Sequence, residues 1–189
     1  MRSGHDKVRR ILAVDPVSRG FGFVVVEGRD RLVDWGTREA RIDKEKTCLN
    51  KIAALWERYE PDVLVLEECA ARGCRRSTRV RGLLRRLRMA AVRRGLRVRA
   101  IPRRAVRKAF ASRDARTKDQ IARAIAAEFP EIAPYLPPLR KPWMTEDQRM
   151  SVFVAVAIAV VVLGKRIENS GERPTSLKVQ RHREMSERK

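Results

Sequence analysis

Short apolar runs rich in β-branched residues recur along the first hundred residues, and their spacing limits the possible folds more than any other feature. They lie at 11–14, 21–26, 63–66 and 96–101, with a further candidate strand at 31–41. The unbroken run at 63–66 is typical of a central strand that is buried on both faces of a sheet. The close succession of the runs at 11–14, 21–26 and 31–41 favours an antiparallel meander.

Segments with helical spacing follow these strands. One spans 44–59 and ends before Pro61, and a second contains the apolar positions of 80–91. Two more helices are predicted to begin at the capping boxes 117–120 (Thr-Lys-Asp-Gln) and 145–148 (Thr-Glu-Asp-Gln). The order β-β-β-α-β-α-β-α-α predicts an α/β fold. Its mixed five-stranded sheet joins an antiparallel meander to parallel strands and carries helices on both faces.

The domain organisation follows from length and from the loss of apolar pattern after residue 164. A chain of 189 residues that is 43% hydrophobic can bury one core, so we assign residues 1–164 to one domain. Residues 165–189 mix charge with Ser, Pro and Asn and are predicted to form a disordered basic tail. The longest apolar run, 152–163, has 12 residues against the ~20 that a membrane span requires. We therefore expect no membrane partner.

The cysteines bear on the compartment. Cys48, Cys69 and Cys74 are odd in number and have neither the spacing of a disulfide framework nor that of a zinc site. We expect Cys69 and Cys74 to be buried or inert. With no targeting signal in residues 1–10, the sequence predicts a reducing, cytoplasmic location.

Positive charge is concentrated in one segment. The net charge is +21, and sixteen Lys and Arg lie at 72–108, which contains no acidic residue. Charge of a single sign favours a phosphate-binding surface and so a nucleic-acid partner. An amphipathic basic helix could instead lie on a membrane, but this one lacks large aromatic residues. Its apolar face is predicted to hold Val80, Leu83, Leu84, Leu87 and Ala91, and its other faces Arg79, Arg81, Arg85, Arg86, Arg88 and Arg93.

Acidic residues end two of the apolar strands: Asp15 follows 11–14 and Glu67 follows 63–66. A carboxylate at such a place is costly unless it is paired, solvated or bound to a metal. Glu146 and Asp147 lie in the first turn of the last predicted helix. Alone, Asp15 could be a turn residue, and the other two could complement a helix dipole. Together, in a chain that binds polyanions, these acids indicate a two-ion Mg²⁺ or Mn²⁺ site for phosphodiester hydrolysis.

These residues resemble the motifs of RuvC-type Holliday-junction resolvases, in the RNase H-like superfamily. The segment 11–15 (Ile-Leu-Ala-Val-Asp), with 20–22 (Gly-Phe-Gly), is similar to the first motif. The segment 65–68 (Val-Leu-Glu-Glu) is similar to the second, in which Glu67 takes the place of the metal ligand. The resemblance implies an RNase H-like fold and a metal-dependent endonuclease that cleaves branched DNA.

Later segments extend this resemblance over roughly residues 9–163. Pro102 through Arg107, and then 118–120 (Lys-Asp-Gln), are similar to two basic segments of the family. The resemblance implies that Arg107 and Lys118 contact DNA phosphates near the metals. It also implies a homodimer, for which the sequence carries no interface signal of its own.

One departure from the family concerns its last helix, which carries two Asp residues three positions apart. Aligning 155–159 (Ala-Val-Ala-Ile-Ala) with the family's similar run puts Ser151 and Val154 at those two positions. We favour a third ligand from Glu146 or Asp147, in the first turn of that helix. The alternative is that the ligand is missing and that the protein binds nucleic acid without cutting it.

The predicted sites combine these inferences. Metal ligands are predicted to be Asp15, Glu67 and Asp147, and the catalytic set adds Glu146 and Lys118. The predicted nucleic-acid contacts are Arg75, Arg76, Arg79, Arg85, Arg86, Arg107 and Lys118. We expect Trp143 to pack against the fold rather than stack on a base. Branched or structured DNA is the expected substrate, and structured RNA is the alternative.

Overall fold

The computed structural model describes residues 9–28, 30–69, 74, 76–141 and 143–164. Its centre is a five-stranded sheet in the order β3-β2-β1-β4-β5. The strands are β1 (Arg10–Val17), β2 (Gly20–Glu27), β3 (Arg31–Glu39), β4 (Val63–Glu67) and β5 (Arg97–Ile101). The pairs β1–β2 and β2–β3 are antiparallel, whereas β1–β4 and β4–β5 are parallel. The predicted mixed sheet is confirmed. The predicted tail, 165–189, lies outside the described residues.

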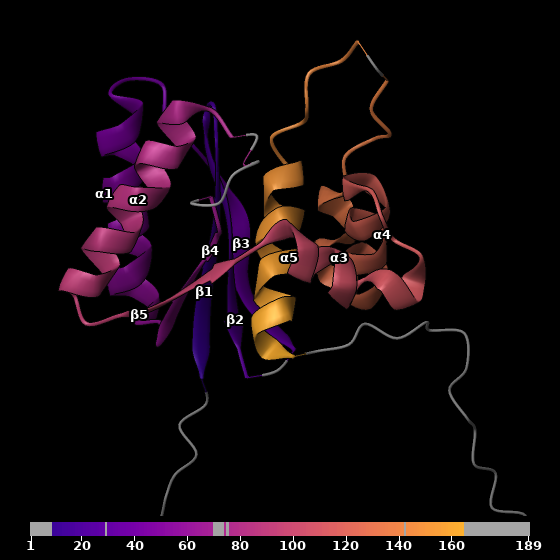
Figure 1. Cartoon of the computed structure of the whole chain (residues 1–189), viewed down its shortest axis with the longest axis horizontal. Coiled ribbons are helices and arrows are strands. Elements are labelled where there is room, and N and C mark those ends of the chain that lie inside the picture. The colour runs from indigo at the N-terminus through magenta and orange to yellow at the C-terminus, as the bar shows by residue number, and fades with distance from the viewer. Residues whose placement is uncertain (1–8, 29, 70–73, 75, 142, 165–189) are drawn as a thin grey trace, which may run out of the picture.

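Helices cover both faces of the sheet (Figure 1). On one face lie α1 (Lys44–Tyr59) and α2 (Thr78–Arg93). On the other lie α3 (Arg103–Ala109), α4 (Lys118–Glu128) and α5 (Met150–Leu163), with the short 3-10 helices η1 (Ala111–Arg113) and η2 (Pro130–Tyr135). In the part of the chain that the structure describes, no helix is both long enough and apolar enough to cross a bilayer.

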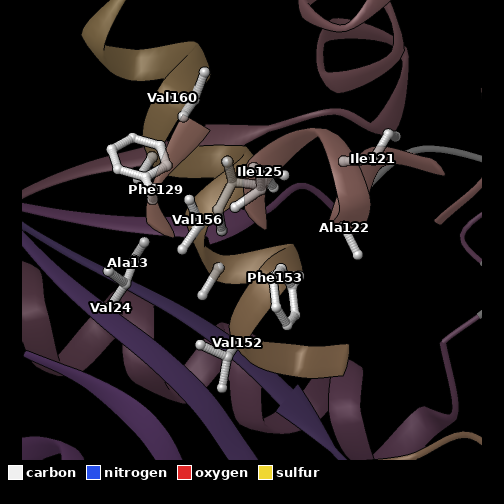
Figure 2. Packing of buried hydrophobic residues seen from close by; sticks show 14 of the residues in the cluster. Ala13, Val24, Ile121, Ala122, Ile125, Phe129, Val152, Phe153, Val156 and Val160 are labelled. Atoms are coloured by element: carbon white, nitrogen blue, oxygen red, sulfur yellow. The ribbon is translucent and has the colours of Figure 1, made fainter. Parts of the chain in front are cut away.

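Alternation along the central strands divides the core into two layers. Leu12 and Val14 of β1 point toward α1 and α2, whereas Ile11 and Ala13 point toward α5. Figure 2 shows the second layer, in which α5 residues such as Val152 pack on the sheet. Because side chains alternate along a strand, the odd-numbered positions of β1 and β4 share the α5 face. This rule also fixes the side to which Asp15 and Glu67 point.

Helix α2 matches its sequence pattern closely. Its buried residues are Val80, Leu83, Leu84, Leu87 and Ala91, and these are the residues that the sequence assigned to the apolar face. Ser77 caps its first turn by accepting a hydrogen bond from the Val80 amide at 3.4 Å. The helix begins two residues after Arg76, a side chain that is central to the site described below.

The two predicted capping boxes have different outcomes. At α4, Thr117 accepts a hydrogen bond from the Gln120 amide, and the Gln120 side chain accepts one from the Thr117 amide, so the box is confirmed. The box at 145–148 is not formed, because α5 begins only at Met150. The Asp147 carboxylate there accepts hydrogen bonds from Arg149 instead. Residues 145–149 therefore precede the helix rather than open it.

Helix α5 approaches the sheet most closely at Gly22 of β2. A Cβ atom at this position would lie 2.3 Å from Ser151 Oγ and 2.4 Å from the Ser151 carbonyl carbon. Because atoms cannot approach this closely, only glycine allows the contact. Gly22 also pairs with Asp15 across β1 and β2. The first turn of α5 is thereby held beside Asp15.

Candidate functional site

Asp15 and Glu67 lie side by side at the ends of two parallel strands. Val14 pairs with Leu66 in the β1–β4 register, so the two acids occupy the next positions along their strands. Both side chains belong to the α5 face, and the two residues are 1% and 6% exposed. The structure thus brings together the two acids that were predicted from strand-end positions.

The Arg76 guanidinium joins these two carboxylates. Its Nη2 donates to Asp15 Oδ1 and lies 2.5 Å from Glu67 Oε2, to which Nε also donates at 2.6 Å. Its Nη1 donates to the carbonyl of Pro16 at 3.3 Å. Arg76 was predicted to contact phosphate, but here it is an internal partner of the acids.

A second arginine, Arg103, completes the group. Its Nε donates to Glu67 Oε1 at 2.5 Å, so each oxygen of Glu67 accepts from a different guanidinium. Arg103 was not among the residues predicted from the sequence. Its position in the sequence could have indicated it. Arg103 follows β5, the parallel neighbour of β4, and so lies at the same edge of the sheet as Glu67.

Burial dominates the electrostatics of Asp15. It raises the pKa of this carboxyl from 3.8 to about 6; the charges of Arg76 and Lys118 act in the opposite direction, and that of Glu67 acts in the same direction as burial. For Arg76, burial alone would lower the pKa, but the charges of Asp15 and Glu67 raise it above its ordinary value. At neutral pH, which lies above the raised pKa of Asp15, the Asp15 carboxylate is therefore ionised and contacts the positive guanidinium of Arg76.

The predicted metal ligand set Asp15, Glu67 and Asp147 is not formed. Within the described ranges, no three His, Cys, Asp or Glu side chains gather closely enough to hold a metal ion. Asp147 binds Arg149, with Oδ2 2.7 Å from Nη2, and these hydrogen bonds lower the pKa of Asp147. Glu146 binds Lys118 Nζ at 2.6 Å. The prediction placed both acids in the first turn of a helix that starts at residue 145, whereas α5 begins at Met150. Their role as metal ligands stays a prediction.

Glu146 and Asp147 still share a cavity with Asp15. This cavity, of about 350 Å³, is also lined by Lys118, Arg76 and Ser151. Lys118 binds Glu146 in this cavity, and its charge also acts on Asp15. Its predicted catalytic role stays a prediction.

Ser151 and Val154 lie where the sequence alignment expected the family's two helix acids. Ser151 is buried and lines the cavity that contains Asp15, and its hydroxyl donates to the carbonyl of Gln148 at 2.5 Å. Val154 lines a second cavity with Glu67. Both positions therefore adjoin the carboxylate pair, but they present a hydroxyl and an isopropyl group rather than carboxylates.

This second cavity, of about 250 Å³, combines basic and apolar walls. Arg76 lies between the two cavities, because it lines both. Residues of α5 such as Phe153 and Val154 form part of the apolar wall. The basic lining consists of Arg76, Arg103, Arg107, Arg116 and Lys118. Arg107 and Lys118 thus line the same cavity as Glu67, and their contacts with DNA phosphates stay a prediction. Arg116 was not predicted.

The remaining predicted contacts lie farther along α2. Arg79, Arg85 and Arg86 are exposed, and Arg86 also binds Glu45 of α1 at 2.5 Å. Arg86 is eight residues into α2, or about 12 Å along its axis, whereas Arg79 lies in its first turn. These exposed side chains extend the basic surface along the helix. Arg75 lies outside the described residues.

Two further expectations are corrected. Cys69 and Cys74 form a disulfide, with Cα atoms 5.2 Å apart, whereas Cys48 is buried and free. The expectation of inert thiols was wrong, and the predicted cytoplasmic location loses that support. Trp143 is 77% exposed, with Lys141 Nζ 5.5 Å from its ring centre, so it does not pack against the fold.

Comparison with known proteins gives the fold. Neither a scan against models of protein families nor a search of curated proteins found a match. Among solved structures, Thermus thermophilus RuvC in complex with a Holliday junction substrate is similar, with a TM-score of 0.59 and 19% identity over 81% of this chain and 91% of that one. A second T. thermophilus RuvC structure gives a TM-score of 0.56 and 21% identity, over 80% and 92% of the two chains.

A third similar structure is that of the yeast mitochondrial Holliday junction resolvase Ydc2. It gives a TM-score of 0.53 and 10% identity, with 82% of this chain and 79% of that one covered. The mixed sheet and the flanking helices agree with these similarities. The chain therefore has a RuvC-like resolvase fold of the RNase H-like type.

Proposed function

We propose that this protein is a nuclease that acts on branched DNA at the Asp15–Glu67 pair. The observation that carries the proposal is the pair itself: two buried carboxylates end the adjacent central strands of a RuvC-like fold. One similar structure is of RuvC with a Holliday junction substrate. The basic segment beside the site supports a polyanionic substrate.

Recognition would depend on the phosphate backbone rather than on the base sequence. Arg103, Arg107 and Lys118 line the cavity beside Glu67 and can bind phosphate oxygens there. The exposed arginines of α2 lengthen this surface. Contacts of this kind orient DNA without reading its sequence, so the branch itself would supply the selectivity.

The carboxylate pair suits one divalent ion. Asp15 and Glu67 both contact the Arg76 guanidinium, so their oxygens already converge on one positive charge. Carboxylate oxygens are the ligands that Mg²⁺ and Mn²⁺ prefer, and Asp15 and Glu67 would hold the ion. When bound, it would supply Lewis acidity to the scissile phosphate and to the attacking water. Because, among the described residues, only these two carboxylates converge on one point, we propose one ion in place of the two that were predicted from the sequence.

Cleavage of a four-way junction tests the proposal. The protein with Mg²⁺ or Mn²⁺ should cut a DNA junction and leave a linear duplex of the same sequence intact. Asp15→Asn should abolish cutting while binding persists, because the phosphate contacts remain. Arg123→Gln, which changes an exposed arginine of α4, is the matched control and should cut normally. Cutting that survives Asp15→Asn contradicts the mechanism, and preferential cutting of an RNA junction would select the RNA alternative.

A second candidate is a branched-DNA-binding protein that does not cut. Ser151 and Val154 favour it, because they replace with a hydroxyl and an alkyl group the carboxylates that the family carries. This candidate predicts binding that weakens with salt and no product with any divalent ion. Val154→Asp places a carboxylate in the cavity beside Glu67 and is then the variant most able to gain cleavage. Cutting by the wild-type protein rules this candidate out.

A further inference from the structure

Arg76 occupies the position between Asp15 and Glu67 in which a cation is needed. Its guanidinium contacts both carboxylates and is also held by the carbonyl of Pro16. The Arg76 side chain is 11% exposed, and those of Asp15 and Glu67 are 1% and 5% exposed. These are the oxygens that a divalent ion would have to bind. Arg76 and such an ion therefore compete for one place.

Charge balance makes this competition strong. Arg76 and Arg103 match the two negative charges of Asp15 and Glu67. A divalent ion added to this group would leave two positive charges uncompensated at a buried site. Like charges a few ångströms apart repel strongly where solvent screening is weak. The ion is thus expected to enter only if a positive group leaves.

Arg76 has a place to go when DNA is bound. It lines both cavities of the site, and other basic side chains, including Arg107 and Lys118, line the walls around it. A phosphodiester drawn to these walls would meet the Arg76 guanidinium, which binds phosphate through paired hydrogen bonds as readily as carboxylate. The phosphate thereby offers Arg76 a new partner and frees the carboxylates.

We infer that Arg76 is an exchangeable internal cation. It holds Asp15 and Glu67 in the free protein, and a divalent ion binds between these carboxylates only after Arg76 has moved to a phosphate of bound DNA. This inference rests on the proposed function. It adds an order of events: DNA first, metal second. It also gives Arg76 a positioning role, because the guanidinium keeps the carboxylate pair together until substrate arrives.

The free protein provides the first test. Mn²⁺ is titrated into the full chain, and the ion that remains free is measured from its electron paramagnetic resonance signal. Wild-type protein and Asp15→Asn should bind equal amounts, because Arg76 excludes the ion. Arg76→Gln should bind one additional Mn²⁺, because the substitution removes the positive charge of the guanidinium. The affinity of the Asp15–Glu67 site for Mn²⁺ should be about ten-fold or more higher in this variant than in the wild type.

Matched variants locate that additional ion. It should disappear in Arg76→Gln with Asp15→Asn, and Arg123→Gln should behave as the wild type, because Arg123 is exposed on α4. If free wild-type protein already binds an Asp15-dependent Mn²⁺ as tightly as Arg76→Gln does, the inference is overturned. Arg76→Gln that folds, as judged by circular dichroism, but gains no Mn²⁺ also overturns it.

The DNA complex provides a second test, which does not need an Arg76 variant to fold. With saturating four-way junction, wild-type protein should bind one more Mn²⁺ than Asp15→Asn does, and this comparison subtracts the ions held by DNA. The proposed exchange is overturned if wild type and Asp15→Asn bind equal numbers of Mn²⁺ in the presence of DNA. It is also overturned if the wild type binds one more Mn²⁺ than Asp15→Asn both with and without DNA. Cleavage is measured separately. If Mn²⁺ binds as predicted but the junction is not cut, the exchange of Arg76 for the ion is supported and the proposed nuclease activity is contradicted.

Discussion

Asp15 is the residue whose environment differs most from that of an ordinary carboxylate. Burial raises its pKa from 3.8 to about 6, against the opposing charge of Arg76. The folded protein therefore holds a proton at Asp15 more tightly than the unfolded chain does. The stability that this proton contributes is full below about pH 4 and is lost as the pH rises through about 6. The shift corresponds to about 3 kcal/mol.

This sign predicts the effect of Asp15→Asn on stability. The variant cannot ionise, so its free energy of unfolding relative to the wild type should rise by about 3 kcal/mol between pH 4 and pH 7.5. Urea unfolding of both proteins at the two pH values measures the change. If the difference in free energy of unfolding between the two proteins stays constant, or if the wild type becomes more stable relative to the variant as pH rises, then the ion pair with Arg76 outweighs burial.

At the residue scale, the sequence predicted positions better than partners. Asp15 and Glu67 could be predicted to converge because each ends an apolar strand, and the β1–β4 register does bring them together. Their arginine partners could not be paired with them in this way. Arg76 reaches the acids from a segment between β4 and α2 that has no periodic pattern, and Arg103 was not recognised beside Glu67.

At the element scale, the start of α5 decides which acids the site contains. The sequence 145–148 carries an acceptable capping box, but Asp147 binds Arg149 and the helix begins at Met150. Because residues 145–149 precede the helix, helical geometry does not set the directions in which the Glu146 and Asp147 side chains point. Local capping signals could not reveal where α5 begins. The close contact between Ser151 and Gly22 joins residues that are far apart in the sequence, so a local pattern does not show it.

Gly22→Ala tests that contact. The added methyl group would overlap the Ser151 backbone, so α5 must shift, and we expect a loss of about 3 kcal/mol in the free energy of unfolding. Gly82→Ala is the control: nothing lies within 4 Å of its added Cβ, and alanine in the middle of α2 should stabilise by up to about 1 kcal/mol. Equal effects of the two substitutions would show that α5 does not press on β2 as described.

The connection that precedes α5 carries an exposed aromatic side chain. Trp143 is 77% exposed in a loop whose later residues, Glu146 and Asp147, line the cavity of Asp15. Trp143→Ala should weaken junction binding by about ten-fold, since stacking on a base contributes on the order of 1–3 kcal/mol. Fluorescence anisotropy with a labelled junction measures this. Leu139→Ala, also exposed in this connection, should bind as the wild type, and an unchanged Trp143→Ala would remove the stacking role.

At the scale of the whole molecule, the order of elements was enough to predict the fold. Periodicity predicted five strands in a mixed sheet with helices on both faces, and the structure has them. The spatial order β3-β2-β1-β4-β5 and the short helix α3 were not predicted. Fold prediction succeeds here because it averages over many apolar positions. The site depends on a few polar side chains. Its composition therefore changed because the turn at 145–148 was predicted as helical and because the segment that carries Arg76 has no periodic pattern.

The net charge of +21 predicts a strong dependence of DNA binding on salt. If six or more phosphates are neutralised, affinity should fall by about a thousand-fold or more between about 50 and 200 mM salt. Titrations of a junction and of linear duplexes of different sequence should show similar salt slopes, because both slopes reflect phosphate contacts. A shallow slope, or a strong sequence preference, would argue against a backbone-binding surface.

The central claim is that a carboxylate pair in a RuvC-like fold cuts branched DNA, and a single-turnover assay tests it most directly. A labelled four-way junction is saturated with wild-type protein, Asp15→Asn or Glu67→Gln, and the divalent ion is then added. We predict that the wild type cuts the junction, whereas both variants bind it and give no product above the protein-free control. Equal product from wild type and variants, or none from the wild type with either Mg²⁺ or Mn²⁺, would contradict the account.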